Sequence, residues 1–224
     1  MAGPHASGSE PFDGLGGTLY DLYIRARPIA NVVGRVAWGL DGRLMYRHME
    51  RAVRSVAASR RVLYVPCGGG LELRWLGPND PARVIAVDGA EHMVRRTRRY
   101  AQRRGLERVE AVQADVTSLP LEDASVDAVL LYNGLHHFSD PAAAVAEVAR
   151  CCAPGAAVHG GTFVLGEGAR WDRNLRRTRR AGSMGPAGTR EDARGWFGAA
   201  GLRLHGEQLS GCFWMFEASR GPAR

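Results

Sequence analysis

The residues best placed to do chemistry follow short apolar runs at three points along the chain. A glycine-rich loop, 66–70, follows the run at 61–65, Asp88 follows a second run, and Asp115 follows a third. Consecutive glycines let a backbone turn sharply and approach a ligand closely. A carboxylate at a strand end can accept hydrogen bonds from both hydroxyls of a ribose, and a second can take the amino group of an adenine. The pattern therefore predicts a nucleoside site.

Each of these signals has a plainer interpretation when it is taken alone. A glycine-rich loop is also what a tight turn requires, and an isolated aspartate after a strand often caps a helix or closes a turn. The order of the three segments favours the nucleoside site, because chance rarely places all of them at successive strand ends.

The glycine-rich loop differs from two common phosphate-binding motifs. Gly70 is followed by Leu71, Glu72 and Leu73, which gives neither G-K-[ST] nor a complete G-x-G-x-x-G. We expect a helix to begin at about Leu71, so that its free N–H groups face a carboxylate or a phosphate. The chain contains no lysine, so all 30 basic residues are arginine and Schiff-base chemistry is excluded. Any proton acceptor must then be His, Asp, Glu, Tyr or water.

Two adjacent histidines, His136 and His137, follow a fourth apolar run at 126–132. A neutral imidazole can take a proton from a hydroxyl, an amine or an activated carbon near neutral pH, so both are candidate catalytic bases. The alternative is that they shape a pocket or hydrogen-bond to backbone carbonyls.

These residues need a scaffold that brings the ends of separate strands to one edge. Apolar runs without clean alternation, joined by helical segments, are typical of a parallel sheet that is covered on both faces. The sequence predicts an α/β, Rossmann-like fold: a seven-stranded, mainly parallel sheet with helices on both faces and a C-terminal antiparallel hairpin. The expected strands are 61–65, 83–87, 109–113, 126–132 and 156–165, with hairpin strands at 202–208 and 210–219. The expected helices are two within 20–59 and one each at 90–104, 141–151 and 190–200.

Four stretches, VLYVPCGGG, VIAVDGAEHMV, QADVTSLPLEDASVDAVLLYNGLHHFSDP and EVARCCAPGAAV, cover about residues 60–165. Their order resembles the class I S-adenosylmethionine-dependent methyltransferases, especially the branch with the ubiquinone and menaquinone biosynthesis enzymes. The resemblance implies S-adenosyl-L-methionine as cofactor, methyl transfer to a small-molecule substrate, and no metal. The cofactor-binding residues that it implies are Tyr20, Tyr64, Cys67, Gly68, Gly70, Asp88, Met93, Asp115, Val116, Asn133 and Leu135.

Two positions depart from the family pattern. Relatives usually carry an acidic residue where this chain has Tyr64 and glycine where it has Pro66. The acid normally helps to organise the loop and the cofactor's ammonium group. Tyrosine supplies a hydroxyl but no negative charge, and the lost bond is worth about 1–3 kcal/mol. This leaves an alternative open, namely a cofactor-binding homologue that no longer methylates and acts as a cyclase, an isomerase or a partner subunit.

The remaining segments complete one domain. We expect a flexible N-terminus over 1–17, a helical lid over 18–59 and the methyltransferase domain over 60–224. Apolar and aromatic lid residues such as Met45 and Tyr46 either line a pocket or form helix core. By the resemblance, an insertion at 166–189 covers the substrate. Its arginines either receive an acidic substrate or face solvent, and those on one helical face are Arg173, Arg176, Arg177 and Arg180.

The charge and cysteine content set the remaining expectations. The net charge of +7 raises an RNA substrate as a third possibility, but no nucleic-acid module accompanies it, so a nucleic-acid partner is not expected. The four cysteines have no C-x-x-C spacing, which predicts neither a metal site nor disulfides and favours a cytoplasmic setting. No apolar stretch reaches the roughly 18 residues that a membrane span needs. The sequence leaves the oligomeric state open.

Overall fold

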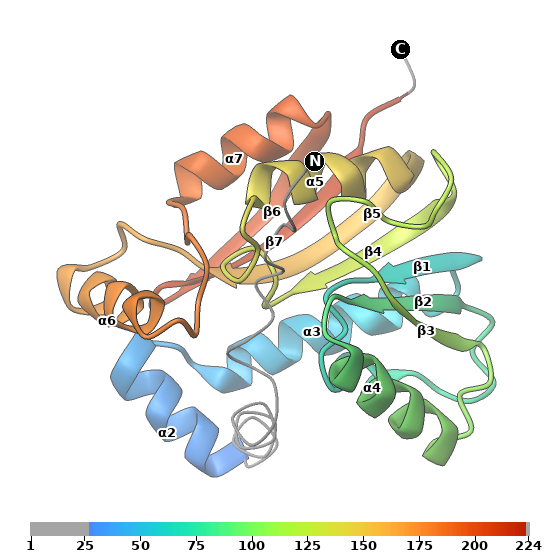
Figure 1. Cartoon of the computed structure of the whole chain (residues 1–224), viewed down its shortest axis with the longest axis horizontal. Helices are drawn as coiled ribbons and strands as arrows, with labels where there is room; N and C mark the ends of the chain where they lie inside the picture. The colour runs from blue at the N-terminus through green and yellow to red at the C-terminus, as the bar shows by residue number, and fades with distance from the viewer. Residues whose placement is uncertain (1–26, 223–224) are drawn as a thin grey trace, which may run out of the picture.

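The computed structural model describes residues 27–222, which contain a seven-stranded sheet in the order β3-β2-β1-β4-β5-β7-β6 (Figure 1). Neighbouring strands from β3 to β5 run parallel. The strand β7 lies antiparallel to both β5 and β6. The predicted α/β sheet with a C-terminal antiparallel hairpin is therefore confirmed.

The elements follow one another in an alternating order. The strands are β1 (Arg61–Tyr64), β2 (Arg83–Asp88), β3 (Val109–Gln113), β4 (Val126–Tyr132), β5 (Cys152–Phe163), β6 (Leu202–Ser210) and β7 (Phe213–Arg220). The helices are α2 (Arg27–Trp38), α3 (Gly42–Val56), α4 (Glu91–Arg103), α5 (Pro141–Cys151), α6 (Ala169–Arg180) and α7 (Arg190–Ala199), with the short 3-10 helix η2 (Glu72–Trp75). No helix within 27–222 is long and apolar enough to cross a membrane.

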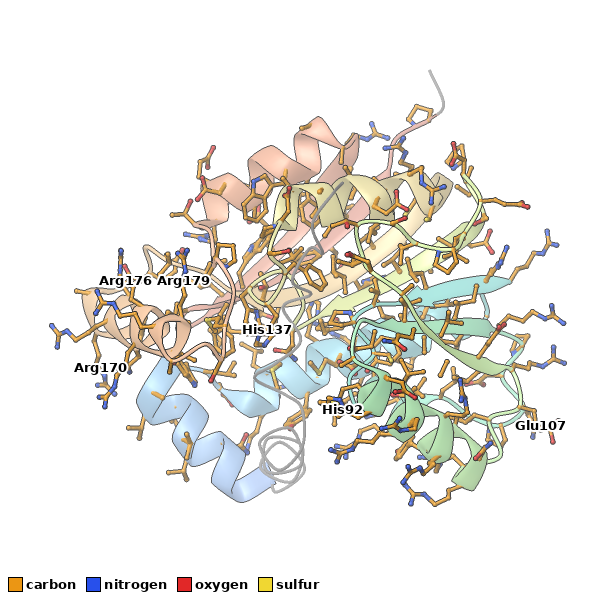
Figure 2. All side chains as sticks on the ribbon, viewed as in Figure 1. His92, Glu107, His137, Arg170, Arg176 and Arg179 are labelled. Carbon is orange, nitrogen blue, oxygen red and sulfur yellow. The ribbon has the colours of Figure 1, made fainter. Side chains whose placement is uncertain are left out.

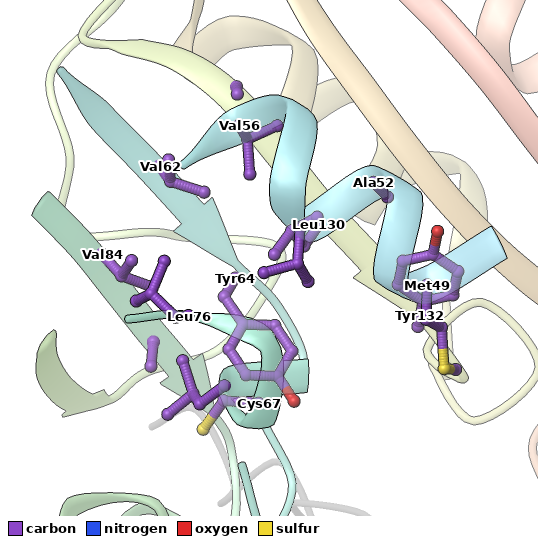
Figure 3. Packing of buried hydrophobic residues seen from close by; sticks show 14 of the residues in the cluster. Met49, Ala52, Val56, Val62, Tyr64, Cys67, Leu76, Val84, Leu130 and Tyr132 are labelled. Carbon is purple, nitrogen blue, oxygen red and sulfur yellow. The ribbon is translucent and has the colours of Figure 1, made fainter. Parts of the chain in front are cut away.

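Alternate side chains of the central strands point to opposite faces of the sheet, so each face has its own core. Val62 and Tyr64 of β1 join a cluster with α3, η2 and α4 (Figure 3). Leu63 and Val65 join a second cluster with α5 and α7. Helices thus cover both faces, as predicted. Met45 and Tyr46 of α3 are buried in the first cluster, which agrees with the helix-core interpretation of these two side chains.

Most predicted helix ends are set by their caps. Thr189 accepts the N–H of Asp192, whose carboxylate in turn accepts the Thr189 N–H at 2.8 Å, forming a complete capping box on α7. Asp140 caps α5 by accepting the Ala143 N–H at 2.9 Å, with Pro141 in the first turn. Such local signals explain why both helices begin where the sequence predicts.

Two predicted boundaries were wrong. The helix expected from Leu71 is only the four-residue 3-10 helix η2, because Gly77 and Pro78 follow within one turn and proline restricts the residue before it. An extended row of helix N–H groups therefore does not face the loop. The strand expected at 156–165 begins at Cys152 and ends at Phe163, since β5 pairs with β4 from Val126 onward despite an irregularity in register.

The junction of α2 and α3 lies against the β6–β7 turn and α6. A Cβ on Gly39 would come within 2.4 Å of the Trp171 ring, and one on Gly211 would come within 2.0 Å of the Trp38 carbonyl oxygen. The Cys212 N–H donates to that same oxygen at 3.0 Å. This packing fixes α2 and α6 side by side (Figure 1).

Candidate active site

Asp88, the last residue of β2, holds the glycine-rich loop in place. Its Oδ2 accepts the Gly68 N–H at 2.8 Å, and its Oδ1 accepts the Ala90 N–H at 3.0 Å. An ionised carboxylate offers about four acceptor positions, so each oxygen keeps capacity for another donor. Burial raises the pKa of Asp88, and the two backbone bonds act against that rise. The carboxylate is thus preoriented and can still accept two hydroxyl groups.

The loop itself is a tight turn with open space above it. Gly68 has φ +48°, and a Cβ built there would meet no atom of residues 27–222 within 4 Å. Its carbonyl accepts the Thr97 hydroxyl of α4 at 2.8 Å. Gly70, with φ +76°, closes the turn by donating its N–H to the Cys67 carbonyl at 2.9 Å. Glycine is required here by backbone conformation, and the space over Gly68 is where a ligand could approach.

Asp115 lies beyond the end of β3 and is exposed. One carboxylate oxygen accepts both the N–H and the hydroxyl of Thr117, each at 2.8 Å. Asp115 therefore does close a turn, as the plainer interpretation holds. In residues 27–222 the other oxygen has no hydrogen bond. The adjoining Val116 is half-buried and packs against the cluster on the α5 face. Turn closure and ligand binding are compatible at this residue.

The other predicted cofactor-binding residues differ in burial. Asn133 has φ +54° and donates its N–H to the Gly161 carbonyl at 2.8 Å. Leu135 is 3% exposed and packs in the α5-side cluster, and Met93 is buried in the first turn of α4. Cys67 is buried in the α3-side cluster, and burial raises the pKa of its thiol. Tyr20 lies outside the described residues.

Tyr64 has a partner that the sequence analysis missed. Its hydroxyl donates to Oε2 of Glu72, and both side chains are buried, Glu72 being 4% exposed. Burial raises the pKa of the Glu72 carboxyl to about 7. A carboxylate thus lies next to the end of β1 even though the strand itself carries none. The one sequence signal was a charged residue between two leucines, Leu71 and Leu73, directly after the glycine-rich loop.

His136 is fixed as a neutral imidazole. It is 1% exposed, and its Nδ1 lies 2.8 Å from the Thr162 hydroxyl and 3.3 Å from the Phe163 N–H. A backbone N–H only donates, so Nδ1 is the acceptor and the ring proton is on Nε2. Burial, together with the neighbouring His137, lowers the pKa of His136 well below its usual value. Its geometry suits a positioning role.

His137 lies beside His136, with ring centroids 4.2 Å apart. Burial lowers the pKa of His137 to about 4, so the ring is neutral at physiological pH. The insertion at 166–189 reaches this loop, because the Gly185 N–H donates to the His136 carbonyl at 2.8 Å. A Cβ on Gly185 would come within 2.8 Å of the His137 carbonyl oxygen. The insertion therefore packs against the backbone of the two histidines, and Figure 2 labels His137 in this part of the molecule.

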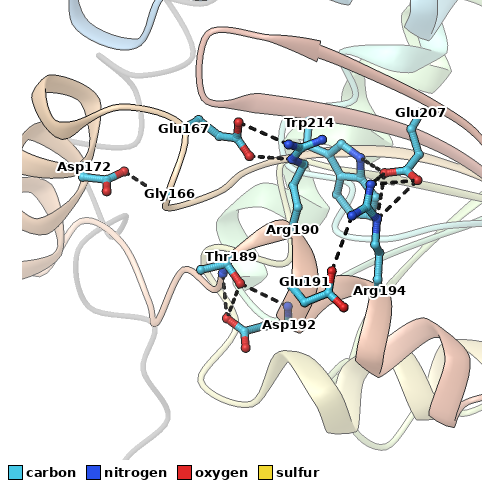
Figure 4. Close-up of polar contacts among 10 residues, drawn as sticks. All are labelled: Gly166, Glu167, Asp172, Thr189, Arg190, Glu191, Asp192, Arg194, Glu207 and Trp214. Carbon is cyan, nitrogen blue, oxygen red and sulfur yellow. Dashed lines mark hydrogen bonds and ion pairs between the residues drawn. The ribbon is translucent and has the colours of Figure 1, made fainter.

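The ends of the insertion are joined by polar contacts (Figure 4). Arg190 pairs with Glu167, with 2.5 Å between Nε and Oε1, and Asp172 accepts the Gly166 N–H at 3.0 Å. The Leu165 N–H donates to the Gly188 carbonyl at 2.9 Å. These bonds join the two ends of the insertion, which contains α6.

The arginines of α6 point away from this site. Figure 2 shows Arg176 and Arg179 at the outer margin of the molecule, far from His137. Asn174 donates to the Ala37 carbonyl at 2.8 Å, which fixes the other side of the helix against α2. The exposure of the arginine face agrees with the solvated interpretation, and the exposed members are Arg173, Arg176, Arg177 and Arg180.

A second buried polar group lies beneath the site on the α3 face. The Tyr132 hydroxyl at the end of β4 is 2.7 Å from His48 Nδ1, and His48 Nε2 is 3.8 Å from Glu217. Burial lowers the pKa of His48 to about 4.

All four cysteines are buried free thiols. Within 27–222 no group of three His, Cys, Asp or Glu side chains is placed to hold a metal ion.

Comparison with known proteins identifies sequences similar to this chain. Residues 63–159 match the methyltransferase domain family. The demethylmenaquinone methyltransferase of Thermus thermophilus is 35% identical over 138 residues, which cover 60% of this chain and 60% of that enzyme. The first curated relatives are likewise matched over less than two thirds of their own length.

Two solved structures share the fold. The YcgJ protein of Bacillus subtilis superimposes with a TM-score of 0.69 at 18% identity, covering 80% of this chain and 100% of that one. The [4+2]-cyclase SpnF gives a TM-score of 0.69 at 17% identity, covering 92% of this chain and 96% of that one. At these identities the likeness concerns the fold alone, which hosts more than one chemistry.

Proposed function

We propose that this chain, a member of the class I S-adenosylmethionine-dependent methyltransferases through its residues 63–159, transfers a methyl group to a small-molecule acceptor. The observation that carries the proposal is Asp88. Its carboxylate is fixed by the Gly68 and Ala90 N–H groups, and it retains acceptor positions beside the open space over Gly68. A paired ribose diol is the ligand group that matches this arrangement.

The residues present suit S-adenosylmethionine. Asp88 would accept the ribose hydroxyls, the free oxygen of Asp115 would accept the adenine amino group, and the backbone of 66–70 would line the methionine part. Val116 and Met93 would pack against the adenine. When bound, the cofactor supplies a methyl group on a positively charged sulfur, and an acceptor displaces it in line. The residues of this chain then hold the two reactants in line and exclude water.

The two histidines take different parts in this proposal. His136, tied through Nδ1 to Thr162 and Phe163, positions the loop after β4. His137 is the better candidate for accepting a proton from the substrate. Its pKa of about 4 keeps it unprotonated but makes it a weak base. It would therefore serve an acceptor that loses its proton readily.

The substrate proposal rests on the relatives. The name of the Thermus thermophilus relative gives demethylmenaquinone, a small molecule, as its substrate, and in this chain the insertion at 166–189 contacts the loop after β4 through Gly185. We place the protein in a reducing, cytoplasmic setting, which suits its buried free thiols. An acidic substrate is not favoured by α6, because the arginines that would receive it are exposed.

A binding and labelling experiment tests the proposal. Calorimetric titration of the whole chain with S-adenosylhomocysteine should give one site, with adenosine binding more weakly. Methyl-labelled S-adenosylmethionine, added with a cell extract, should then label the small-molecule fraction. Absence of binding would overturn the proposal. Binding with label found only in the RNA fraction would overturn its small-molecule part, and binding with no label in any fraction would favour the non-methylating homologue.

A further inference from the structure

We propose that Glu72 receives the ammonium group of the cofactor's methionine part, and that Tyr64 is the positioning residue that holds the Glu72 carboxylate for it. The carboxylate would thus have moved from the end of β1 to η2. This inference rests on the proposed function, because it assigns one group of the same cofactor.

The geometry places Glu72 beside the methionine end of the site. Glu72 begins η2, two residues after Gly70, which closes the glycine-rich turn. The Tyr64 hydroxyl donates to Oε2 of Glu72, so the end of β1 and the start of η2 are joined by side chains. Figure 3 shows the Tyr64 ring next to Cys67 of the loop. The carboxylate therefore lies beneath the turn that would carry the methionine part.

Glu72 lacks the counter-charge that a buried carboxylate normally needs. In residues 27–222 its side chain has one hydrogen-bond donor from another residue, the Tyr64 hydroxyl, and no ion pair. The nearest cationic group that acts on it is Arg74 on the same short helix. A buried charge is stable when it is paired, and a single neutral donor does not pair it. An arriving ammonium group would supply the missing charge.

The length of the Tyr64 side chain explains how a tyrosine on β1 can act together with the carboxylate of Glu72 on η2. Tyrosine reaches beyond the length of an aspartate, and its hydroxyl touches η2 instead of ending at the strand. The ring is buried in the α3-side core, which also contains Leu130 and Tyr132. Tyr64 and Glu72 together then do what an acid on the strand does in relatives. Glu72 therefore compensates for the absence of an acidic side chain at position 64.

A ligand series tests this inference apart from general binding. S-adenosylhomocysteine carries an ammonium and a carboxylate, its decarboxylated analogue carries only the amine, and 5′-methylthioadenosine carries neither. Glu72→Gln should weaken the first two ligands by about 10- to 100-fold and the third by less than about twofold. The matched control is Glu107→Gln, an exposed residue at the far margin of Figure 2, which should leave all three affinities unchanged.

Two further variants keep the test decisive if Glu72→Gln is unstable. Tyr64→Phe removes the hydroxyl donor and should weaken only the amine-bearing ligands, by about tenfold. Tyr64→Asp would place a second carboxylate near Glu72 and remove its donor, so it should not tighten S-adenosylhomocysteine. Equal weakening of all three ligands by Glu72→Gln, or tightening by Tyr64→Asp, would overturn the inference. Failure of the wild type to bind any ligand would instead overturn the proposed function.

Discussion

The loops at the strand ends and the segments that cover them use charge in opposite ways. Near the strand ends, hydrogen bonds fix Asp88, which is half-buried at the end of β2, and Glu72, which is buried at the start of η2. On α6 the arginines are exposed, and the polar groups that matter join the ends of the insertion to each other. Buried charges have few alternatives and so specify a ligand, whereas exposed charges are screened and specify little.

This difference indicates which residues should determine the ligand selectivity of the protein. Cofactor recognition should depend steeply on single residues at the strand ends. The cover should act through its attachment, since α6 contacts α2 through Asn174 and the segment after α6 contacts the loop after β4 through Gly185. Three substitutions and one change of pH test this contrast, in decreasing order of effect.

The largest effect is expected for Asp88→Asn. The new amide would present a donor where Gly68 and Ala90 already donate, and it would weaken the bonds to both ribose hydroxyls. S-adenosylhomocysteine should bind about 100-fold more weakly or worse, as measured by calorimetry. Asp127→Asn is the control, because Asp127 also accepts a strand N–H, that of Arg61 at 2.9 Å, but at the opposite edge of the sheet. Equal losses in both variants would contradict the role of Asp88.

The second effect concerns packing between two of the loops. A Cβ on Gly134 would come within 2.5 Å of Pro66 Cδ and 2.8 Å of Phe138 Cζ. Gly134→Ala should lower the free energy of unfolding by about 1–3 kcal/mol in a urea titration. Gly195→Ala, in α7, where no atom of the described part of the chain lies within 4 Å of the new methyl group, should instead raise it by about 0.5–1 kcal/mol. A neutral Gly134→Ala would show that the loops are not packed as described.

The third effect is a pH dependence of ammonium recognition. Because the pKa of Glu72 is about 7, its carboxyl is mostly protonated at pH 6 and mostly ionised at pH 8. The affinity for S-adenosylhomocysteine relative to 5′-methylthioadenosine should therefore rise about tenfold between pH 6 and pH 8. Burial raises the Glu72 pKa above its unfolded value. The free energy of unfolding of the unliganded protein should therefore fall as the pH rises toward 7, whereas the affinity ratio rises.

The neighbours of Glu72 do not titrate in this window. Burial raises the pKa of Tyr64 and Tyr132 well above the usual tyrosine value, and raises that of Cys67 as well. His48, behind Tyr132, stays neutral above its pKa of about 4. Asp88 contributes equally to both ligands, since both carry the ribose. Glu72→Gln should abolish the pH dependence of the ratio, and its persistence in that variant would exclude Glu72 as its source.

The smallest effect is expected at the base of the insertion. Arg190→Gln breaks the ion pair with Glu167 and should speed tryptic cleavage within 166–189 by about two- to tenfold, by favouring local opening. Arg176→Gln also removes one tryptic site but no contact that holds the helix, so it should leave the remaining cleavage rates unchanged. Similar acceleration in both variants would contradict the attachment described in Figure 4.

The sequence predicted what depends on local signals. Strand and helix bounds such as Val109–Gln113 and Pro141–Cys151 were correct because apolar runs, capping residues and prolines act within a few residues. Asp88 and Asp115 were identified for the same reason, since each stands at or just beyond the end of a strand. Their roles as cofactor ligands, and those of His136 and His137 as bases, stay predictions.

What the sequence did not reveal depends on contacts across the fold. The Tyr64–Glu72 bond joins residues eight positions apart through a turn whose helix was expected to be longer. The hydrogen bond between His136 and Thr162 joins residues 26 positions apart. The packing of Gly39 against Trp171 likewise joins two distant segments. Side-chain pairs of this kind follow from tertiary packing, which a periodic pattern does not encode.

A crystal structure of the whole chain with S-adenosylhomocysteine tests the central claim most directly. The account predicts both ribose hydroxyls within hydrogen-bond distance of Asp88, the adenine amino group at Asp115 and the ammonium group at Glu72. A ribose bound away from Asp88, or a ligand on another edge of the sheet, would contradict it.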